Sequence, residues 1–270
     1  MHWNSKCRSN TFQRFTRTNF FTASSLGGAC TLVPGQLDEL IEKLPVQLGH
    51  SASTLILRHT LFPYVTAFLD DDRRSKVDKQ MRGVGGKPHQ HLGPRSPGID
   101  FATHLRFCPK CASEMGELYG ETYWLREHQL PGSLICHLHE SHLITGPPIP
   151  TAGRPAYIPA PSPMEIPKYE ESEPDKALRA LLLALTNLGA GLLKEDGQVL
   201  VAKIRAQLYG SSEALQIEIL DRFRHLILPA FQAYNVMLDE DALLAAFKPR
   251  TTALPPLYYL IASALAGPNA

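Results

Sequence analysis

The sequence has no long uninterrupted hydrophobic run and almost no net charge. Its most apolar stretch, residues 178–193, contains Arg179, Thr186 and Asn187, so it does not predict a membrane span. The 27 Lys and Arg residues nearly balance the 26 Asp and Glu residues, and the net charge of +1 excludes a protein that is basic throughout. No secretory signal opens the chain, so we expect a cytoplasmic protein that contacts no membrane.

Signatures of nucleotide-binding and DNA-cleaving enzymes are also missing. The chain has no glycine-rich loop ending in Lys-Ser or Lys-Thr, which P-loop proteins use to bind phosphates. It has no evident cluster of carboxylates of the kind that binds two metal ions for DNA cleavage. These absences predict a protein that is not an enzyme and has no small-molecule substrate.

Cysteines are few, and their placement is uneven. There are five, and three of them lie in residues 106–143 together with four of the eleven histidines. Cys108 and Cys111 form one pair with two residues between them, and Cys136 and His139 form a second pair, 24 residues further on. Two such pairs can direct four ligands into one tetrahedral site. The spacing therefore predicts a Zn²⁺ site, which is structural because four protein ligands leave no open position.

Other interpretations of these residues stay open at this stage. His128, His137 and His142 are alternatives to His139 as the imidazole ligand, although His128 is expected to be a hydrogen-bonded core residue. We expect most of the aromatic-rich face between the two pairs to pack around the metal site. This face consists of Tyr119, Tyr123, Trp124, Leu125, His128 and Leu130.

Two reactive-thiol interpretations are weaker. A redox pair at Cys108 and Cys111 needs a strand-to-helix setting, which the flanking residues do not suggest. A nucleophile at Cys136 with His128 as its base would need a group that orients the base and an oxyanion site, and no nearby residues suggest either. A zinc-dependent or thiol-dependent hydrolase would require one of these arrangements.

A basic segment precedes the cysteine-rich region. Residues 73–95 hold seven Lys or Arg residues against one acid, Asp78, which gives a local charge of +6. Cations in such a segment can contact several phosphates of duplex DNA, although a charge run is also typical of a solvated surface. The tentative DNA contacts are Arg73, Arg74, Lys76, Lys79, Arg82 and Lys87. Residues 1–37 are also basic and carry interleaved phenylalanines, which fits either nucleic-acid contact or the start of a helical domain.

The hydrophobic pattern predicts helices on both sides of the metal site. We expect helices at residues 37–44 and at 53–62, the second capped by Ser53 and ended by Pro63. Further helices are expected from leucine stripes in residues 178–192 and 215–226, from an acidic start at Asp239, and around residues 257–265. The last two, joined by a basic turn, are compatible with a helix-turn-helix.

The predicted fold is mainly α, with helical domains flanking an embedded zinc ribbon-like module. Nine prolines and an acidic patch in residues 146–175 predict an extended linker. The expected organisation is a helical N-terminal region with the basic segment at 1–100, a zinc-binding module at 101–146, a Pro-rich linker at 147–175 and a helical C-terminal domain at 176–270.

The cysteine-rich region resembles the TniQ family, which includes target-selection proteins of bacterial DNA transposons. The resemblance is carried by Arg106-Phe107-Cys108-Pro109-x-Cys111, Tyr119-Gly120-Glu121-x-Tyr123-Trp124, His128-Gln129-Leu130-Pro131-Gly132 and Cys136-x-x-His139. It extends less tightly upstream and covers residues 40–145. The Leu-Pro opening and Ser-Trp helix with which the family usually begins a helix-turn-helix-like domain are not found, so we expect a truncated N-terminus.

This resemblance implies an adaptor for target-site selection in transposition, associated with the bacterial nucleoid. Such a protein binds double-stranded target DNA, or a complex that marks it, and recruits an AAA+ ATPase regulator that leads the transposase there. The alternative is a zinc-stabilised protein-protein scaffold that never touches DNA, which the near-neutral charge favours and the basic segment opposes.

Overall fold

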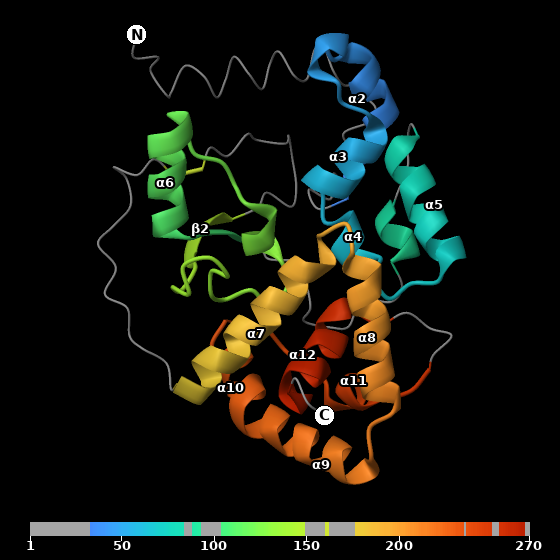
Figure 1. The fold of residues 1–270 in the computed structure, drawn as a ribbon, viewed down its shortest axis with the longest axis vertical. Coiled ribbons are helices and arrows are strands. Elements are labelled where there is room, and N and C mark those ends of the chain that lie inside the picture. Colours follow the sequence, from blue (N-terminus) through green and yellow to red (C-terminus); the bar gives the residue numbers. More distant parts are fainter. Residues whose placement is uncertain are drawn as a thin grey trace.

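A computed structural model describes residues 33–83, 88–92, 104–148, 160–161, 176–234, 236–249 and 254–267. It is mainly helical, which confirms the predicted fold class (Figure 1). A group of N-terminal helices and a larger group of C-terminal helices lie beside a small module that carries one two-stranded sheet. Lys87 and most of residues 1–37 fall outside the described residues.

The N-terminal helices follow the predicted pattern, with one correction. They are α2 (Leu37–Lys43), the 3-10 turn η1 (Val46–Leu48), α3 (Ala52–His59), α4 (Phe62–Val65), α5 (Asp71–Arg82) and the 3-10 turn η2 (Pro88–His91). The cap of α3 is Ser51, whose side chain accepts the Thr54 N–H at 3.1 Å, so the prediction of Ser53 was wrong. Ser53 lies inside α3, because the chain becomes helical one residue after Ser51. Pro63 does not end α3; it lies in the first turn of α4.

The module between the two helical groups has four elements. They are β1 (His104–Phe107), α6 (Pro109–Tyr119), the 3-10 turn η3 (Arg126–Gln129) and β2 (Ile144–Pro148). Strands β1 and β2 pair antiparallel, with Phe107 opposite Ile144, and the register shifts between His104 and Arg106. This pairing closes the module into a loop whose two ends lie together.

The C-terminal helices form the largest part of the core. They are α7 (Lys176–Leu192), α8 (Gly197–Tyr209), α9 (Glu213–Arg222), the π-helical turn η5 (Phe223–Ile227), α10 (Leu228–Gln232), α11 (Glu240–Ala245) and α12 (Pro256–Ala266). The predicted stripes face inward: Leu182 and Leu185 on α7 are buried, as are Ile219 and Phe223. Asp239 caps α11 as predicted, because its carboxylate accepts the Asp241 and Ala242 N–H groups.

Helix α12 lies at the centre of these helices and contacts α7 and α8 (Figure 1). Eight of its eleven residues are buried, from Leu257 through Ser263 and again at Leu265. A recognition helix must present one polar face to a DNA groove, and α12 has no such face. The helix-turn-helix interpretation of α11 and α12 is therefore wrong: the second helix forms from the same hydrophobic pattern, but the core covers it.

One hydrophobic core joins the N-terminal helices, the module and the C-terminal helices. Gly132 shows how closely the module is inserted. Its φ is +82°, and a Cβ atom there would lie 2.6 Å from Cδ1 of Leu257 and 3.2 Å from Cδ2 of Leu185. The module thus enters a layer of α7 and α12 side chains that has no room for a methyl group. The predicted domain boundaries remain predictions, because a shared core does not itself mark them.

Among the residues that the structure describes, no helix combines the length and the hydropathy needed to span a bilayer.

Replacing Gly132 with Ala should destabilise the protein more than replacing Gly120 with Ala. Both glycines have positive φ, at +82° and +72°, so each change adds about 1–2 kcal/mol of backbone strain. Nothing lies within 4 Å of a Cβ at Gly120. Gly132→Ala therefore costs a further ~1–3 kcal/mol of overpacking. The free energies of unfolding in urea measure the difference, and equal losses would show that the loop is not inserted as described.

Candidate metal centre

The first pair of predicted ligands lies where strand β1 becomes helix α6. Cys108 is the N-cap residue of α6, Pro109 occupies the first turn, and Cys111 lies in that same turn. The N-terminus of a helix carries a partial positive charge, which stabilises thiolates there. The prediction that the flanking residues do not supply a strand-to-helix setting was wrong, because β1 precedes Cys108 directly. The pair nevertheless does not stand alone, since Cys136 and His139 lie against it.

The second pair of ligands lies on a tight turn. The Glu140 N–H donates to the Cys136 carbonyl at 2.8 Å, and the Cys136 N–H donates to the Ser141 carbonyl, also at 2.8 Å. Glu140 takes a positive φ of 52°, and Ile135 bridges His142 just outside the turn. These bonds hold Cys136 and His139 on the same side of the turn.

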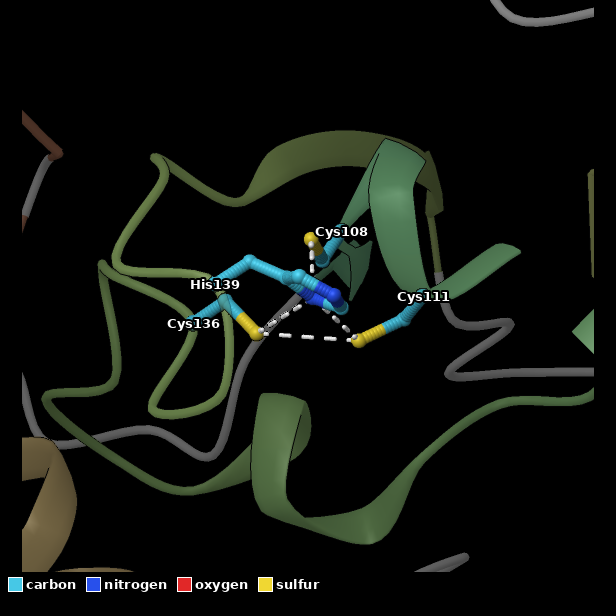
Figure 2. Close-up of side chains that lie close together, drawn as sticks. All are labelled: Cys108, Cys111, Cys136 and His139. Carbon is cyan, nitrogen blue, oxygen red and sulfur yellow. Dashed lines mark hydrogen bonds between the residues drawn. The ribbon is translucent and has the colours of Figure 1, made fainter. Parts of the chain in front are cut away.

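The structure brings all four predicted ligands together (Figure 2). Their ligand atoms lie within 4.8 Å of one another. Nδ1 of His139 is 3.6 Å from Sγ of Cys108, 3.2 Å from Sγ of Cys111 and 3.8 Å from Sγ of Cys136. The Sγ atoms of Cys111 and Cys136 are 3.6 Å apart.

These separations fit a single tetrahedral ion. With metal–sulfur bonds of about 2.3 Å and metal–nitrogen bonds of about 2.0 Å, tetrahedral angles place ligand atoms roughly 3.5–3.8 Å apart. The three sulfur–nitrogen separations, 3.2, 3.6 and 3.8 Å, lie on both sides of the value of about 3.5 Å expected for such a pair. All three cysteine side chains are buried, so the group can enclose an ion away from solvent.

Hydrogen bonds among the three thiols shift their pKa values in opposite directions. The pKa of the Cys108 thiol is lowered, chiefly because Cys111 and Cys136 donate to its sulfur. The pKa values of Cys111 and Cys136 are raised, chiefly because each is hydrogen-bonded to Cys108. A metal ion bound by three thiolates must displace the protons of Cys111 and Cys136, so its affinity is expected to rise with pH.

Glu114 supports the histidine ligand, and the sequence analysis missed it. Its Oε1 atom lies 2.8 Å from Nε2 of His139, so the ring donates there and turns Nδ1 toward the sulfurs. Glu114 lies three residues after Cys111 on α6, on the same face of the helix. This spacing was visible in the sequence, but nothing marked Glu114 among the other acids of the helix. Ser141 adds a second contact, with Oγ at 3.3 Å from Sγ of Cys108.

The three alternative histidines lie outside the four-atom group. His128 is buried, as predicted, with Nε2 at 3.9 Å from Sγ of Cys111. Burial lowers its pKa to about 4, so the ring is neutral at pH 7. Burial also lowers the pKa of His137, which is half-buried. His128 contacts Cys111 rather than Cys136, so the structure does not place it as a base for a Cys136 nucleophile.

Part of the predicted aromatic packing is absent at the surface of the module. Trp124 packs edge-on against Phe107, with ring centroids 6.2 Å apart. Tyr119 and Tyr123 instead remain 64% and 49% exposed. The expectation that most of this aromatic-rich segment packs around the metal centre is therefore wrong for these two tyrosines, because Tyr119 lies at the end of α6 and Tyr123 lies just beyond it, where both remain at the surface.

Arg126 joins the module to both groups of helices. Its Nη1 donates to the carbonyls of Leu57 at 2.7 Å and Thr60 at 3.3 Å, where α3 ends. Its Nη2 donates to the Leu193 carbonyl at 3.1 Å, where α7 ends. Carbonyls at the end of a helix have no partner within the helix and carry partial negative charge. One guanidinium therefore satisfies the ends of two helices from different parts of the chain.

Arg106 and Gln129 hold the loop that enters the core. The guanidinium of Arg106 donates to the carbonyls of Ser133 at 2.5 Å and Leu130 at 2.9 Å. Burial lowers the pKa of Arg106 to about 10, so the side chain stays charged at pH 7. The side-chain amide of Gln129 accepts the Arg106 N–H and donates to the Arg106 carbonyl. These two bonds pair the backbone of β1 in the way that a neighbouring strand would.

The predicted DNA contacts that can be described lie on α5, at the opposite edge of the molecule from α6 (Figure 1). Arg73 pairs with Asp70 at 3.5 Å and Lys76 with Asp72 at 2.6 Å. Lys79 is exposed.

Two of these cations have structural contacts. Arg74 stacks over Phe62, with its guanidinium carbon 5.1 Å from the ring centroid. Arg82 bonds Asp78 at 2.7 Å and the Ser53 hydroxyl at 2.8 Å. The helix and its cap hold five bases and four acids, a net charge of +1. The count of +6 is larger because it begins just after Asp70, Asp71 and Asp72 and includes Lys87 and Arg95, which lie beyond the helix. A role for these residues in DNA binding stays a prediction.

Comparison with known proteins places the module in a family. The family model described as TniQ matches residues 6–143, which include α5 and all four candidate ligands. The chain is also 29% identical over 108 residues to the transposon Tn7 transposition protein TnsD of Escherichia coli. That alignment covers 40% of this chain and 21% of the relative, so the chain matches about a fifth of the length of TnsD.

Replacing Cys108 or Cys136 with Ser should remove the bound metal and unfold the segment between the two pairs. Loss of one ligand removes most of the binding energy, which is also folding energy. Metal content by mass spectrometry and the unfolding temperature measure both effects, with Cys30→Ser as the control. A Cys108→Ser protein that keeps its metal and its unfolding temperature would show that the ligand set is wrong.

Replacing Glu114 with Gln should weaken metal binding while the fold persists. Loss of the carboxylate partner of a ligating histidine lowers affinity about tenfold to a hundredfold. Competition with a chromophoric chelator measures the affinity. Glu117→Gln is the matched control, because the Glu117 carboxylate lies on the same helix but accepts from Ser113 instead. Equal affinities of the two variants would remove the supporting role from Glu114.

Proposed function

Because the chain belongs to the TniQ family, we propose that it is a target-site selection adaptor in DNA transposition. In this role it engages target DNA, or a complex that marks it, and recruits an AAA+ ATPase regulator that leads the transposase there. The observation that carries the proposal is the family match over residues 6–143, which contains both ligand pairs. The likeness to TnsD, a transposition protein by name, supports the same process.

Zn²⁺ is the ion that we assign to the candidate metal centre. Three thiolates and one imidazole in a tetrahedral arrangement are the donors of structural zinc sites. Four protein ligands leave no position for a substrate, so the ion supplies cross-linking rather than chemistry. In this proposal the chemistry of strand transfer belongs to the transposase.

Helix α5 is the element that we propose contacts DNA. Arg73 and Lys76 have side chains 36% and 54% exposed, and Lys79 is also exposed. Ion pairs at the surface contribute little stability, so a phosphate can take the place of Asp70 or Asp72 as the partner. Arg74 and Arg82 are less suited, because stacking on Phe62 and bonding to Asp78 already fix them.

The second candidate is a scaffold that bridges two proteins without touching DNA. The observation that favours it is the pairing of α5 cations with acids of the same helix, which leaves a net charge of +1 there. Under this function the metal centre and the shared core hold two binding surfaces in a fixed arrangement. Both candidates predict the same fold and the same metal, so only DNA binding separates them.

A triple variant tests the DNA-binding proposal. Replacing Arg73, Lys76 and Lys79 with Gln removes three cations without adding repulsion against Asp72. Each lost phosphate contact should make the slope of log K against log salt shallower by about 0.9. Fluorescence anisotropy with labelled duplexes, one random and one from an insertion site, gives the slope over several salt concentrations.

The matched control replaces Lys194, Lys203 and Lys248, which are exposed residues of the C-terminal part, with Gln. The proposal expects the wild-type protein and this control to bind with the same slope and to favour the insertion site. Equal changes in both triple variants would mean that only net charge matters. Absence of binding at low salt would favour the scaffold.

A further inference from the structure

The outer end of the module exposes apolar side chains that the rest of the described molecule does not cover. Leu118 is 74% exposed, Tyr119 is 64% exposed and Tyr123 is 49% exposed. The rings of Tyr119 and Tyr123 lie 6.3 Å apart. Single exposed hydrophobic residues are common, whereas neighbouring ones indicate a contact surface. We call these three residues the aromatic patch.

Packing of the module does not account for the aromatic patch. The inner face of α6 buries Cys111, Ala112 and Met115 beside the metal centre. The helix then ends at Gly120, whose φ of +72° turns the chain so that Tyr123 returns to Tyr119. Covering these side chains removes apolar surface from water, so a partner that packs on the patch gains binding energy.

Three exposed acidic residues lie close in the chain to the aromatic patch. Glu114, Glu117 and Glu121 are exposed on α6 and just after it. Residues 108–143 hold five acids and two bases, for a net charge of −3, and three thiolates with one divalent ion add a further −1. Such a surface repels nucleic-acid phosphates and attracts lysine and arginine. Tyrosine rings also bind cations over their faces.

The position of the patch allows a partner and DNA to bind at once. Helices α6 and α5 lie at opposite edges of the molecule in the view of Figure 1. The shared core and the Arg126 bonds join the module firmly to the helices between them. A protein on α6 therefore keeps a set position relative to α5.

We propose that the aromatic patch and its glutamates form a docking surface for a protein partner that presents arginine or lysine beside apolar side chains. This inference rests on the proposed adaptor function, of which it names the protein-binding face. Hydrophobic contact with Tyr119 and Tyr123 supplies affinity, and the exposed glutamates select a basic partner over DNA.

The test uses the full zinc-loaded chain and a labelled synthetic helical peptide with leucines on one face and arginines beside them. Two comparison peptides replace the arginines with glutamates or the leucines with serines. Anisotropy titrations at low and high salt give the affinities. The arginine–leucine peptide should bind at least about tenfold more tightly than either comparison peptide, and more weakly at high salt.

Two module variants are compared with matched variants elsewhere. Tyr119→Ser with Tyr123→Ser, and Glu117→Gln with Glu121→Gln, should each weaken peptide binding at least about fivefold. The controls are Ile217→Ser with Val199→Ser, and Glu213→Gln with Glu218→Gln, all on exposed positions of α8 and α9. Zinc content and unfolding temperature establish that each variant is folded.

Absence of binding, or equal weakening by the control variants, would overturn the docking surface. Duplex DNA binding by the same variants separates this inference from the proposed function. The docking surface predicts unchanged DNA binding in both module variants. If the protein binds the peptide through the patch but never binds DNA, the DNA-binding part of the proposed function fails and the docking surface stands.

Discussion

The short segment from Arg126 to Leu134 is the constraint on which the arrangement of the molecule depends. Its first residue bonds the ends of α3 and α7, and its buried leucines at 130 and 134 belong to the common core. Gly132 lies where no larger residue fits between α7 and α12. Two partly buried cations, Arg106 and Arg126, donate to backbone carbonyls in and around this segment. Helices that are distant in the chain therefore contact the same short segment.

The four-ligand centre determines where that segment can lie. Twenty-four residues separate Cys111 from Cys136 in the chain. A metal ion held by both would close a loop that contains the whole inserted segment. Because metal binding to such a group is coupled to folding, an ion bound there would stabilise the same structure as the core. His128 links the two parts, because it is buried at the base of the loop with Nε2 near Sγ of Cys111. A substitution at the four-ligand centre is therefore expected to destabilise the inserted segment, and a substitution in the segment is expected to destabilise the centre.

Charge is distributed unevenly over the surface. Helix α5 offers cations that already have acidic neighbours, so any phosphate there competes with Asp70 and Asp72. The module on the other side combines an acidic surface with exposed aromatic rings. The two sides suit different partners, which is consistent with an adaptor. The neutral total hides this division, because net charge sums the two sides.

The sequence by itself determined the ligand pairs, the helical stripes and the mainly α fold, because each depends on spacing between near neighbours. Tertiary structure excluded the three alternative histidines, and it alone decided that Glu114 orients His139 and that the core covers α12. These features depend on residues brought together from distant parts of the chain, and local spacing does not encode such contacts. The acids that offset the α5 cations were visible in the sequence at 70–72, yet only the folded helix shows that they are partners.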